Sequence, residues 1–463
     1  MIKLKSSEIA RIIAGTLHGD DVEVTAPAFL GSGECTDGSI FIAIKGERVD
    51  GHDFIEDAFQ HGAVLAITSR QVSQRCIVVA DVSKALALLA TYVRENLKSL
   101  QVVGITGSQG KTTTKELLFE TLSSHGDTVA TKGNNNNELG VPLTLLRCDE
   151  STQYCIVEMG ARHIGDIAAL SQIAQPNIGV VLRVAAAHIG EFGSLENIAL
   201  AKSEMISSLA DDSVAILGQY DPFTKAMSSL HQGKVVTFGE DSSSIVRATD
   251  IELREGCAHF DLVTPEGRST VALRQYGLHQ VPNALAAASV AHVLGLSTDQ
   301  IATGLSTAEM HAAMRMQVIE LDDLTLINDA YNASPDSMAA ALTTLAHLSQ
   351  ERGGESWAFL GNMRELGEST TSSHREIGTL CSELRIDHLV TVNAPDYAAG
   401  VGDGSETSVH LCSTTEEVKA LLPHLNRGDV ILCKGSRSEK LEDIAAEIEK
   451  FWIAKLADEE DGK

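Results

Sequence analysis

The chain has 463 residues, a length typical of about three domains, and 43% of them are hydrophobic, which is enough to fill sizeable cores. Its formal net charge of −27 excludes a protein that coats a nucleic-acid duplex, because that class needs a basic face. Any phosphate-rich ligand must therefore be held by local positive side chains, helix N-termini and metal ions.

The eight cysteines are scattered and form no CxxC pair, so neither a zinc ribbon nor a disulfide framework is indicated. We expect buried, reduced thiols in a cytoplasmic protein. The N-terminus lacks the pattern of a signal peptide, and no apolar run reaches about 18 residues. The sequence therefore predicts no membrane span.

Residues 1–97 are predicted to form a small α/β domain. Short apolar runs predict strands at 40–46, 64–69 and 76–80. The polar, glycine-punctuated stretch KGERVDGHDF (45–54) is predicted to be a loop. Its Lys45, Arg48 and His52 could meet an anionic ligand, or the loop could simply be solvated.

The stretch 102–117, VVGITGSQGKTTTKEL, is predicted to bind a polyphosphate. A strand, a glycine turn, a Lys-Thr pair and a helix follow one another, although the motif is T-G-x-x-G-K-T rather than the strict P-loop pattern. Gly107 and Gly110 let the backbone approach the phosphates, and the helix N-terminus attracts their charge. Lys111 would neutralise the β- and γ-phosphates, and the Thr112 hydroxyl would bind Mg²⁺. An ordinary strand–helix turn is the alternative.

Residues 98–312 are predicted to form a central domain around this loop. The stretch 131–146 contains four consecutive asparagines, which either contact a substrate or make a polar connection before a helix. Glu158 ends a buried strand, where ligands collect in α/β sheets. It could bind Mg²⁺ opposite Thr112, or it could be a surface carboxylate.

Three further residues of this region could have either a functional or a purely structural role. His188 follows the next strand end, and Lys202 lies on a predicted helix at 195–209. Residue type and spacing alone do not single out either, because such side chains are usually structural or solvated. Asn283, in a predicted helix at 276–295, could contact an adenine edge or cap the helix.

Residues 313–463 are predicted to form a third domain with a parallel sheet of β–α units. Its strands are expected at 324–329, 357–361, 387–392 and 430–435. Ser334-Pro335-Asp336 has the residue types of a helix start. Asp329 ends a strand and could bond to a ribose.

Together, several motifs resemble those of the Mur ligases, and the resemblance covers essentially the whole chain. They are GITGSQGKTTTKE, GNNNNELGVP, VEMGARHIGDI, AHIGEFGS with AKSEM, NDAYNASPDSM and GNMRELG. The last two motifs resemble those of the family members that add D-alanyl-D-alanine to UDP-N-acetylmuramoyl-tripeptide. The Asp-Asn-Pro-Arg box typical of members that add the third peptide residue does not occur in the sequence.

The resemblance implies an α/β fold of three domains. Residues 1–97 would bind the uridine nucleotide of the substrate, 98–312 would form a P-loop ATPase-like parallel-sheet domain, and 313–463 a Rossmann-like domain. The implied reaction is ATP-dependent amide ligation through an acyl phosphate, in cytoplasmic peptidoglycan precursor synthesis. We expect small-molecule substrates, no nucleic acid and a monomer.

The resemblance also implies site residues. The catalytic set would be Lys111, Glu158, His188 and Lys202. The ATP phosphates would be wrapped by Gly107, Ser108, Gln109, Gly110, Lys111, Thr112 and Thr113. One Mg²⁺ would bind Thr112 and Glu158, and a second Glu158 and His188. Lys202 matches a lysine that CO₂ carbamylates, which turns an ammonium into a carboxylate-like group suited to a hard cation.

Other positions match regions that contact the nucleotide or the UDP-linked substrate. Those matching nucleotide contacts are Asn283, Arg315 and Asp329. Those matching the region that faces the UDP-sugar-peptide are Asn136, Asn137 and the loop from Lys45 to Asp53, with Lys45, Arg48, Asp50 and His52.

The chain also departs from the family pattern at several places. Gly31-Ser32-Gly33 stands where Asp-Ser-Arg is usual, Arg183 and Ser334 each replace an asparagine, and Asn362 replaces an aspartate. Because the nucleotide and metal residues are intact, we interpret these as altered substrate-side detail. The alternatives are another Mur-type or folylpolyglutamate-type ligase, a non-catalytic nucleotide-binding regulatory protein, and a P-loop kinase.

Overall fold

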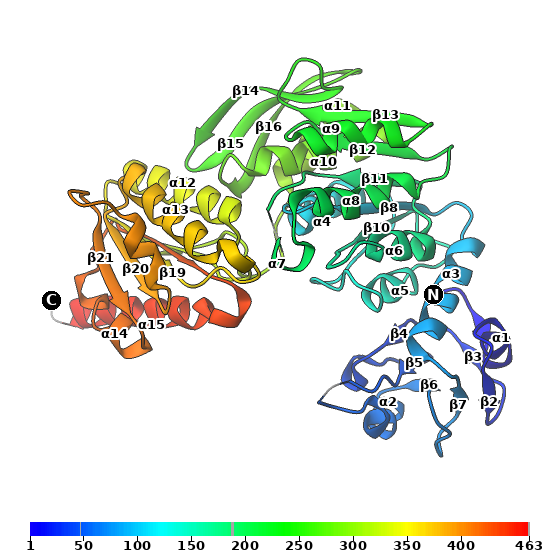
Figure 1. Cartoon of the computed structure of the whole chain (residues 1–463). Coiled ribbons are helices and arrows are strands. Elements are labelled where there is room, and N and C mark those ends of the chain that lie inside the picture. Colours follow the sequence, from blue (N-terminus) through cyan, green and yellow to red (C-terminus); the bar gives the residue numbers. More distant parts are fainter. Residues whose placement is uncertain (47, 187–188, 462–463) are drawn as a thin grey trace.

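The computed structural model describes residues 1–46, 48–186 and 189–461, with side chains described as far as residue 458. The described chain forms three α/β domains, and the central one lies between the other two (Figure 1). The three-domain α/β fold expected from the sequence is confirmed.

The N-terminal domain is built on a five-stranded sheet in the order β2-β7-β6-β5-β4, beside a small pair of β1 and β3. Strands β4 to β7 run parallel, and β2 closes one edge antiparallel. The elements are β1 (Leu4–Lys5), α1 (Ser6–Ile12), β2 (Thr16–His18), β3 (Glu23–Val24), β4 (Ala28–Phe29), β5 (Ser39–Ile42), α2 (Ile55–Gln60), β6 (Ala63–Thr68), β7 (Cys76–Val78) and α3 (Val82–Asn96).

Helix α3 joins the N-terminal domain to the central one. Its buried Leu86 and Leu89 belong to one apolar core with Leu145 and Leu170 of the central domain. The Arg94 guanidinium at its end donates hydrogen bonds across the junction, of 3.0 Å to the Gln175 carbonyl and 2.9 Å to Asn177 Oδ1. These contacts dock the two domains through both apolar and polar groups.

The central domain is built on a nine-stranded sheet in the order β16-β15-β14-β13-β12-β11-β8-β10-β9. The elements are β8 (Gln101–Thr106), α4 (Lys111–Ser123), β9 (Thr128–Ala130), α5 (Gly140–Leu145), β10 (Tyr154–Glu158), α6 (Asp166–Ala174), β11 (Ile178–Val181), α7 (Ile189–Phe192), α8 (Leu195–Ser207), β12 (Val214–Gly218), α9 (Pro222–Ala226), β13 (Lys234–Gly239), β14 (Val246–Arg254), β15 (Cys257–Thr264), β16 (Gly267–Tyr276), α10 (Gln280–Val293) and α11 (Thr298–Thr307). Helix α10 begins later than the predicted 276, because β16 continues to Tyr276.

Which residues of each strand are buried depends on whether helices pack on one face of the sheet or on both. Helices α4, α10 and α11 pack on one face and α5, α6 and α8 on the other, so parallel strands such as β8 are apolar on both sides. In the antiparallel strand β15, only alternate residues are buried, including Phe260 and Leu262, because helices cover one face there.

Strand β8 marks the point in the sheet where the strand order reverses, since the strands that follow it in the chain are added on both of its sides. It pairs in parallel with β10 on one side and with β11 on the other. Loops that follow neighbouring parallel strands diverge at such a switch point and leave a crevice where ligands bind. The phosphate loop predicted at 107–113 follows β8 directly and therefore lies at this crevice.

The C-terminal domain has a six-stranded sheet in the order β17-β18-β22-β19-β20-β21, parallel except for β17. Helices α12 and α13 cover one face, and α14 and α15 the other. The elements are β17 (Gln317–Leu321), β18 (Leu324–Asp329), α12 (Pro335–Arg352), β19 (Ser356–Leu360), α13 (Thr370–Glu383), β20 (His388–Val392), β21 (Ser408–Cys412), α14 (Thr415–Lys419), β22 (Val430–Lys434) and α15 (Leu441–Asp461).

Short 3₁₀ helices connect some of these elements. They are Ser32–Glu34, Gly51–Phe54, Met227–Leu230, Gly367–Ser369, Pro395–Gly400, Leu422–His424 and Arg437–Glu439. All eight cysteines are described and free, and all but Cys257 are buried. Among the described residues, no helix is long and apolar enough to cross a membrane.

Candidate active site

The phosphate loop connects β8 to α4, and its own hydrogen bonds and backbone geometry define its shape. Gly110 has φ of +81°, and a Cβ at that position would lie 2.1 Å from Asn283 Oδ1, so only glycine fits. Lys111 Nζ donates a 2.8 Å hydrogen bond to the Gly107 carbonyl. Ser108 Oγ donates to the Ala185 carbonyl at 2.9 Å. The loop therefore encloses a concave backbone that ends at the N-terminus of a 13-residue helix.

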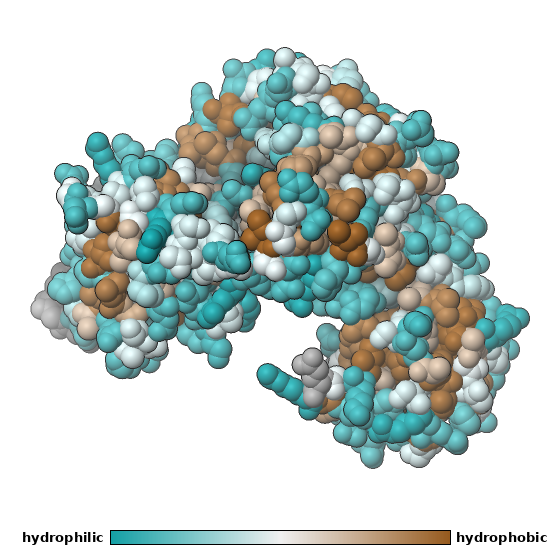
Figure 2. Space-filling model, viewed as in Figure 1, coloured by the Kyte–Doolittle hydropathy of each residue, from teal (hydrophilic) through white to brown (hydrophobic). Residues whose placement is uncertain are grey.

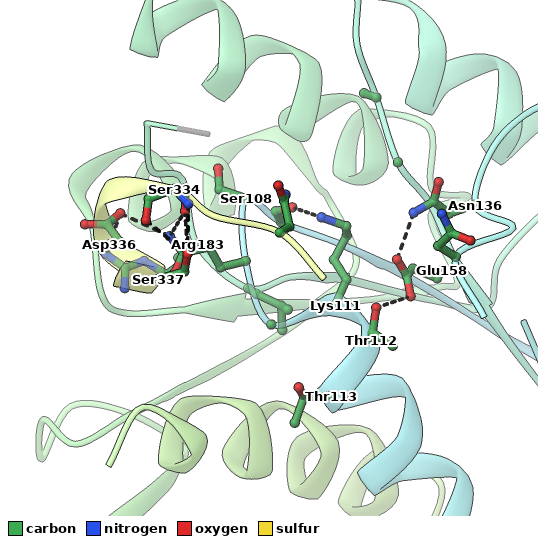
Figure 3. A pocket seen from close by; sticks show the side chains of 18 of the residues that line it. Ser108, Lys111, Thr112, Thr113, Asn136, Glu158, Arg183, Ser334, Asp336 and Ser337 are labelled. Carbon is green, nitrogen blue, oxygen red and sulfur yellow. Dashed lines mark hydrogen bonds and ion pairs between the residues drawn. The ribbon is translucent and has the colours of Figure 1, made fainter. Parts of the chain in front are cut away.

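A hydroxyl and a carboxylate meet beside this loop (Figure 3). Thr112 Oγ1 donates to Glu158 Oε2 at 3.0 Å, and Asn136 Nδ2 donates to Glu158 Oε1 at 2.8 Å. Glu158 is 1% exposed, and no cation among the described residues lies within ion-pair distance of it. The pair offers two hard oxygen donors at a buried negative charge, which is the chemistry that Mg²⁺ requires.

The asparagine stretch forms the side of the site next to Glu158. Asn136 reaches that carboxylate, whereas Asn137 Oδ1 accepts from the Gly140 backbone at 3.1 Å at the start of α5. Lys115, which the sequence analysis did not single out, supports this stretch. Its buried Nζ donates to the carbonyls of Thr131 at 3.0 Å and Gly133 at 3.2 Å. A lysine four residues after Lys111 on a helix is the signal that could have found it.

Lys202 lies on α8, is 4% exposed, and lines the same cleft as Lys111. Burial and the nearby positive charge of Lys111 lower the pKa of Lys202 to about 7. Much of the amine is therefore neutral near neutral pH. The predicted residue His188 lies outside the described residues, and no group of three or more His, Cys, Asp or Glu among those described could hold a metal ion.

The three residues predicted to contact the nucleotide line the cleft from two domains. Asn283 Nδ2, on the first turn of α10, donates to Gln280 Oε1 at 2.9 Å. The Arg315 guanidinium lies 3.8 Å from the centre of the Tyr331 ring. Asp329 Oδ2, at the end of β18, accepts a 2.6 Å hydrogen bond from Lys434 Nζ.

The cleft also contains polar contacts between the central and C-terminal domains that the sequence did not reveal. Gln109 Nε2 donates to Ser334 Oγ at 3.2 Å and to Asp336 Oδ2 at 3.4 Å, at the start of α12. Arg183 Nη2 lies 3.9 Å from the same Asp336 oxygen. We call these four side chains the cross-domain contact, and Figure 3 shows Arg183, Ser334 and Asp336 of it. It connects the phosphate loop directly to the C-terminal domain.

The predicted residues of the N-terminal domain do not line this cleft. Lys45 and Arg48 are exposed on a loop that follows β5. Asp50 and His52 are engaged with each other, since Asp50 Oδ1 accepts from His52 Nδ1 at 2.6 Å. The structure thus brings together the predicted residues of the central and C-terminal domains that it describes, and leaves this second group on a separate domain.

The cleft between the central and C-terminal domains has a volume of about 920 Å³. That is within the range of roughly 300–1,000 Å³ typical of small-molecule sites. The phosphate loop, Glu158, Lys202 and the three nucleotide candidates all line it. An elongated anionic ligand with a bound cation fits this arrangement.

Three family models match successive parts of the chain. The Mur ligase middle domain matches residues 105–291, the glutamate ligase domain of Mur ligases matches 314–437, and the catalytic domain of the Mur ligase family matches 29–102. The family models therefore cover most of the chain, in the same order as its three domains.

Similar proteins are known in sequence and in structure. A Mycobacterium tuberculosis protein named UDP-N-acetylmuramoyl-tripeptide–D-alanyl-D-alanine ligase is 37% identical over 496 aligned residues, which cover 96% of this chain and 97% of the relative. A crystal structure of MurF from Acinetobacter baumannii has a TM-score of 0.87 at 34% identity, covering 97% of this chain and 99% of that one. MurF ligase from Thermotoga maritima in complex with ADP has a TM-score of 0.81 at 31% identity, covering 93% and 99%. The chain belongs to the Mur ligase family.

Proposed function

We propose that this chain joins D-alanyl-D-alanine to the terminal carboxylate of UDP-N-acetylmuramoyl-tripeptide, with ATP as the energy source, in peptidoglycan precursor synthesis. The observation that carries the proposal is the phosphate loop beside the buried Thr112–Glu158 pair, in a cleft that the C-terminal domain also lines. Relatives that carry this activity in their names match the chain over nearly its full length.

The reaction must activate a carboxylate, because amide formation from a carboxylate and an amine is uphill in water. A tripeptide carboxylate oxygen attacks the γ-phosphorus of ATP, the bond to the β-phosphate oxygen breaks, and an acyl phosphate and ADP result. The neutral amine of D-alanyl-D-alanine then attacks the acyl carbon. Inorganic phosphate leaves from the tetrahedral intermediate and takes up the proton that the attacking nitrogen loses.

The chain's own residues would reduce the repulsion between the two anions. The phosphate loop presents backbone N–H groups and the positive end of α4 to the phosphates. Lys111 Nζ, now bonded to the Gly107 carbonyl, would turn to the γ-phosphate and place a full charge there. Contact of the C-terminal domain with the loop would exclude water, which otherwise hydrolyses the acyl phosphate.

Thr112 Oγ1 and Glu158 Oε2 would hold a Mg²⁺ ion, which when bound neutralises charge on the transferring phosphoryl group. We expect a second ion at Glu158 and His188. Asn136 would orient the Glu158 carboxylate through the hydrogen bond of 2.8 Å.

Carbamylation of Lys202 is part of the proposal. A buried amine whose pKa is about 7 has a free lone pair near neutral pH. That lone pair can add to the carbon of CO₂, and loss of one proton leaves a carbamate anion. The product carries two oxygens and a negative charge, so it can hold or orient a hard cation where an ammonium could not.

The remaining assignments are also proposals. Asn283, Arg315 and Asp329 would contact the nucleotide from two sides of the cleft. Asn136, Asn137 and the loop with Lys45, Arg48, Asp50 and His52 would lie in regions that face the UDP-sugar-peptide. The division at 1–97, 98–312 and 313–463 would separate uridine-nucleotide binding, ATP binding and closure. A cytoplasmic location and a monomeric state stay predictions.

The decisive experiment measures phosphate release from ATP by the purified chain with UDP-N-acetylmuramoyl-tripeptide, with and without D-alanyl-D-alanine. We expect release that requires both substrates, and ¹⁸O from a labelled tripeptide carboxylate in the liberated phosphate. A panel of other amino acids and acceptors distinguishes related ligases. Binding of ATP without any phosphate release would instead favour the regulatory alternative.

A further inference from the structure

The loop after β5 in the N-terminal domain forms a short two-stranded arm. Lys45 and Asp50 pair as an antiparallel bridge, and Gly46 N donates to the Val49 carbonyl at 2.9 Å. Lys45 and Arg48 are exposed, and Val49 is 56% exposed. The described residues 45–46 and 48–50, which we call the arm, therefore present two basic side chains on a chain of net charge −27.

The arm lies at the edge of the sheet where ligands bind. Strands β5 and β6 run parallel, so the arm after β5 and Ser69-Arg70 after β6 emerge at the same carboxyl edge. In the space-filling view, this side of the N-terminal domain borders a hollow beneath the other two domains (Figure 2). A nucleotide-linked substrate that extends from the cleft would cross this hollow.

A buried histidine fixes the base of the arm. The His52 side chain is 1% exposed, and its Nδ1 lies 2.6 Å from Asp50 Oδ1. Its Nε2 accepts from the Ser69 backbone N–H at 3.1 Å and lies 3.2 Å from Ser69 Oγ. Because a backbone N–H can only donate, Nε2 must be the acceptor. Nδ1 therefore carries the proton and donates the hydrogen bond to Asp50 Oδ1.

The carboxylate of Asp50 completes the connection. Its Oδ1 also accepts from the His52 backbone at 3.0 Å, and its Oδ2 accepts from Arg70 Nη1 at 3.0 Å. These hydrogen bonds from His52 and Arg70 hold the pKa of Asp50 well below its usual range, so the carboxylate stays charged. Asp50 belongs to the arm and Ser69 directly follows β6, so His52 ties the arm to the sheet.

We propose that Asp50, His52 and Ser69 form a positioning unit that aims the basic arm at the diphosphate of the UDP-linked substrate. The inference rests on the proposed function, which supplies the substrate. It assigns His52 a role different from contact with that substrate, because its ring is enclosed and both nitrogens have protein partners. The contacts themselves fall to Lys45 and Arg48.

The test compares His52→Ala with His61→Ala. His61 is an exposed histidine that also pairs with an aspartate, Asp57, four residues before it in the chain. We expect His52→Ala to raise KM for the UDP-linked substrate about tenfold, with kcat and KM for ATP nearly unchanged. His61→Ala should change none of these. In a Lys45→Ala/Arg48→Ala background, His52→Ala should add little, because a positioning unit has nothing left to aim.

A second readout does not depend on catalysis. Trypsin should cut after Lys45 and Arg48 faster in His52→Ala and in Arg70→Ala than in the wild type. The Arg70 side chain is exposed, so Arg70→Ala removes one hydrogen bond to Asp50 without opening the core. Unchanged cleavage in both variants overturns the inference even if the wild-type chain has no ligase activity. If the wild type is active, two kinetic results overturn the inference but leave the proposed function standing. One is the same KM for the UDP-linked substrate in wild type and His52→Ala. The other is a full effect of His52→Ala on that KM in the Lys45→Ala/Arg48→Ala background.

Discussion

Thr112 Oγ1 and Glu158 Oε2 lie 3.0 Å apart although 46 residues separate them in the sequence. Strand pairing brings them together, since Glu158 is opposite Ile105 in the parallel β8–β10 ladder, just before the phosphate loop. Both side chains are buried, so their oxygens are held in place before any cation arrives.

Glu158→Gln keeps the size of the side chain and removes its charge. We expect the Mg²⁺ concentration for half-maximal activity to rise at least about tenfold, because a ligand charge is lost. Thr112→Ser, which keeps the hydroxyl, should stay close to the wild type. A magnesium titration of phosphate release measures both. An unchanged titration midpoint in Glu158→Gln would argue against the proposed ion site.

Lys111→Ala should lower ATP turnover by at least about 100-fold, because a charge aimed at the transferring phosphoryl group is removed. Lys234→Ala, which alters an exposed lysine at the start of β13, is the control. The measurement is ADP formation with all substrates present, and circular dichroism checks that the fold is retained. Full ADP release by Lys111→Ala would count strongly against the assigned role.

Lys202→Ala should be inactive and should regain part of its activity when a short carboxylate such as acetate is added. The added acid would occupy the place of the carbamate oxygens. Lys225→Ala, at an exposed position on α9, should behave like the wild type. In the wild-type chain, ¹³CO₂ should give a carbamate signal in ¹³C NMR that Lys202→Ala lacks. Absence of both rescue and signal, with the fold intact, would contradict carbamylation.

The cross-domain contact should couple the phosphate loop to the C-terminal domain. Gln109→Ala and Asp336→Ala each remove one end of a hydrogen bond that is worth about 1 kcal/mol. We expect kcat/KM for ATP to fall roughly fivefold in each, and the double variant to lose less than the product of the two. Strict multiplicativity of the two effects would show that the residues act independently.

Acidification should destabilise the chain through His279, at the cleft. Burial lowers its pKa to about 4 from an ordinary value of 6.5, with Asp329 opposing and Lys434 reinforcing this effect. Between about pH 6.5 and 4 the unfolded chain takes up the proton more readily, so stability falls as the pH decreases through that window. His279→Gln should reduce this loss of Tm.

The control for this pH series is His311→Gln, at an exposed histidine. Its melting temperature should follow the pH as the wild type does. Parallel Tm–pH curves for wild type and His279→Gln would mean that this histidine does not carry the effect.

Much of the fold follows from local sequence. Apolar runs predict buried strands such as β10 and β18, because a sheet covered on both faces requires them. Ser334-Pro335-Asp336 also predicts the start of α12, because proline is tolerated in the first turn of a helix and not in its interior. The predicted strand at 40–46 ends at Ile42, because the arm begins to turn back on itself at Lys45.

The phosphate loop is predictable from the sequence, because its strand, glycine turn, lysine and helix are contiguous. The distant side chains that complete the site become known only from the folded chain. Gln109 Nε2 meets Ser334 Oγ, and Arg183 Nη2 lies 3.9 Å from Asp336 Oδ2, across two domains. Such contacts depend on the packing of whole sheets and domains, and residue spacing along the chain carries no record of it.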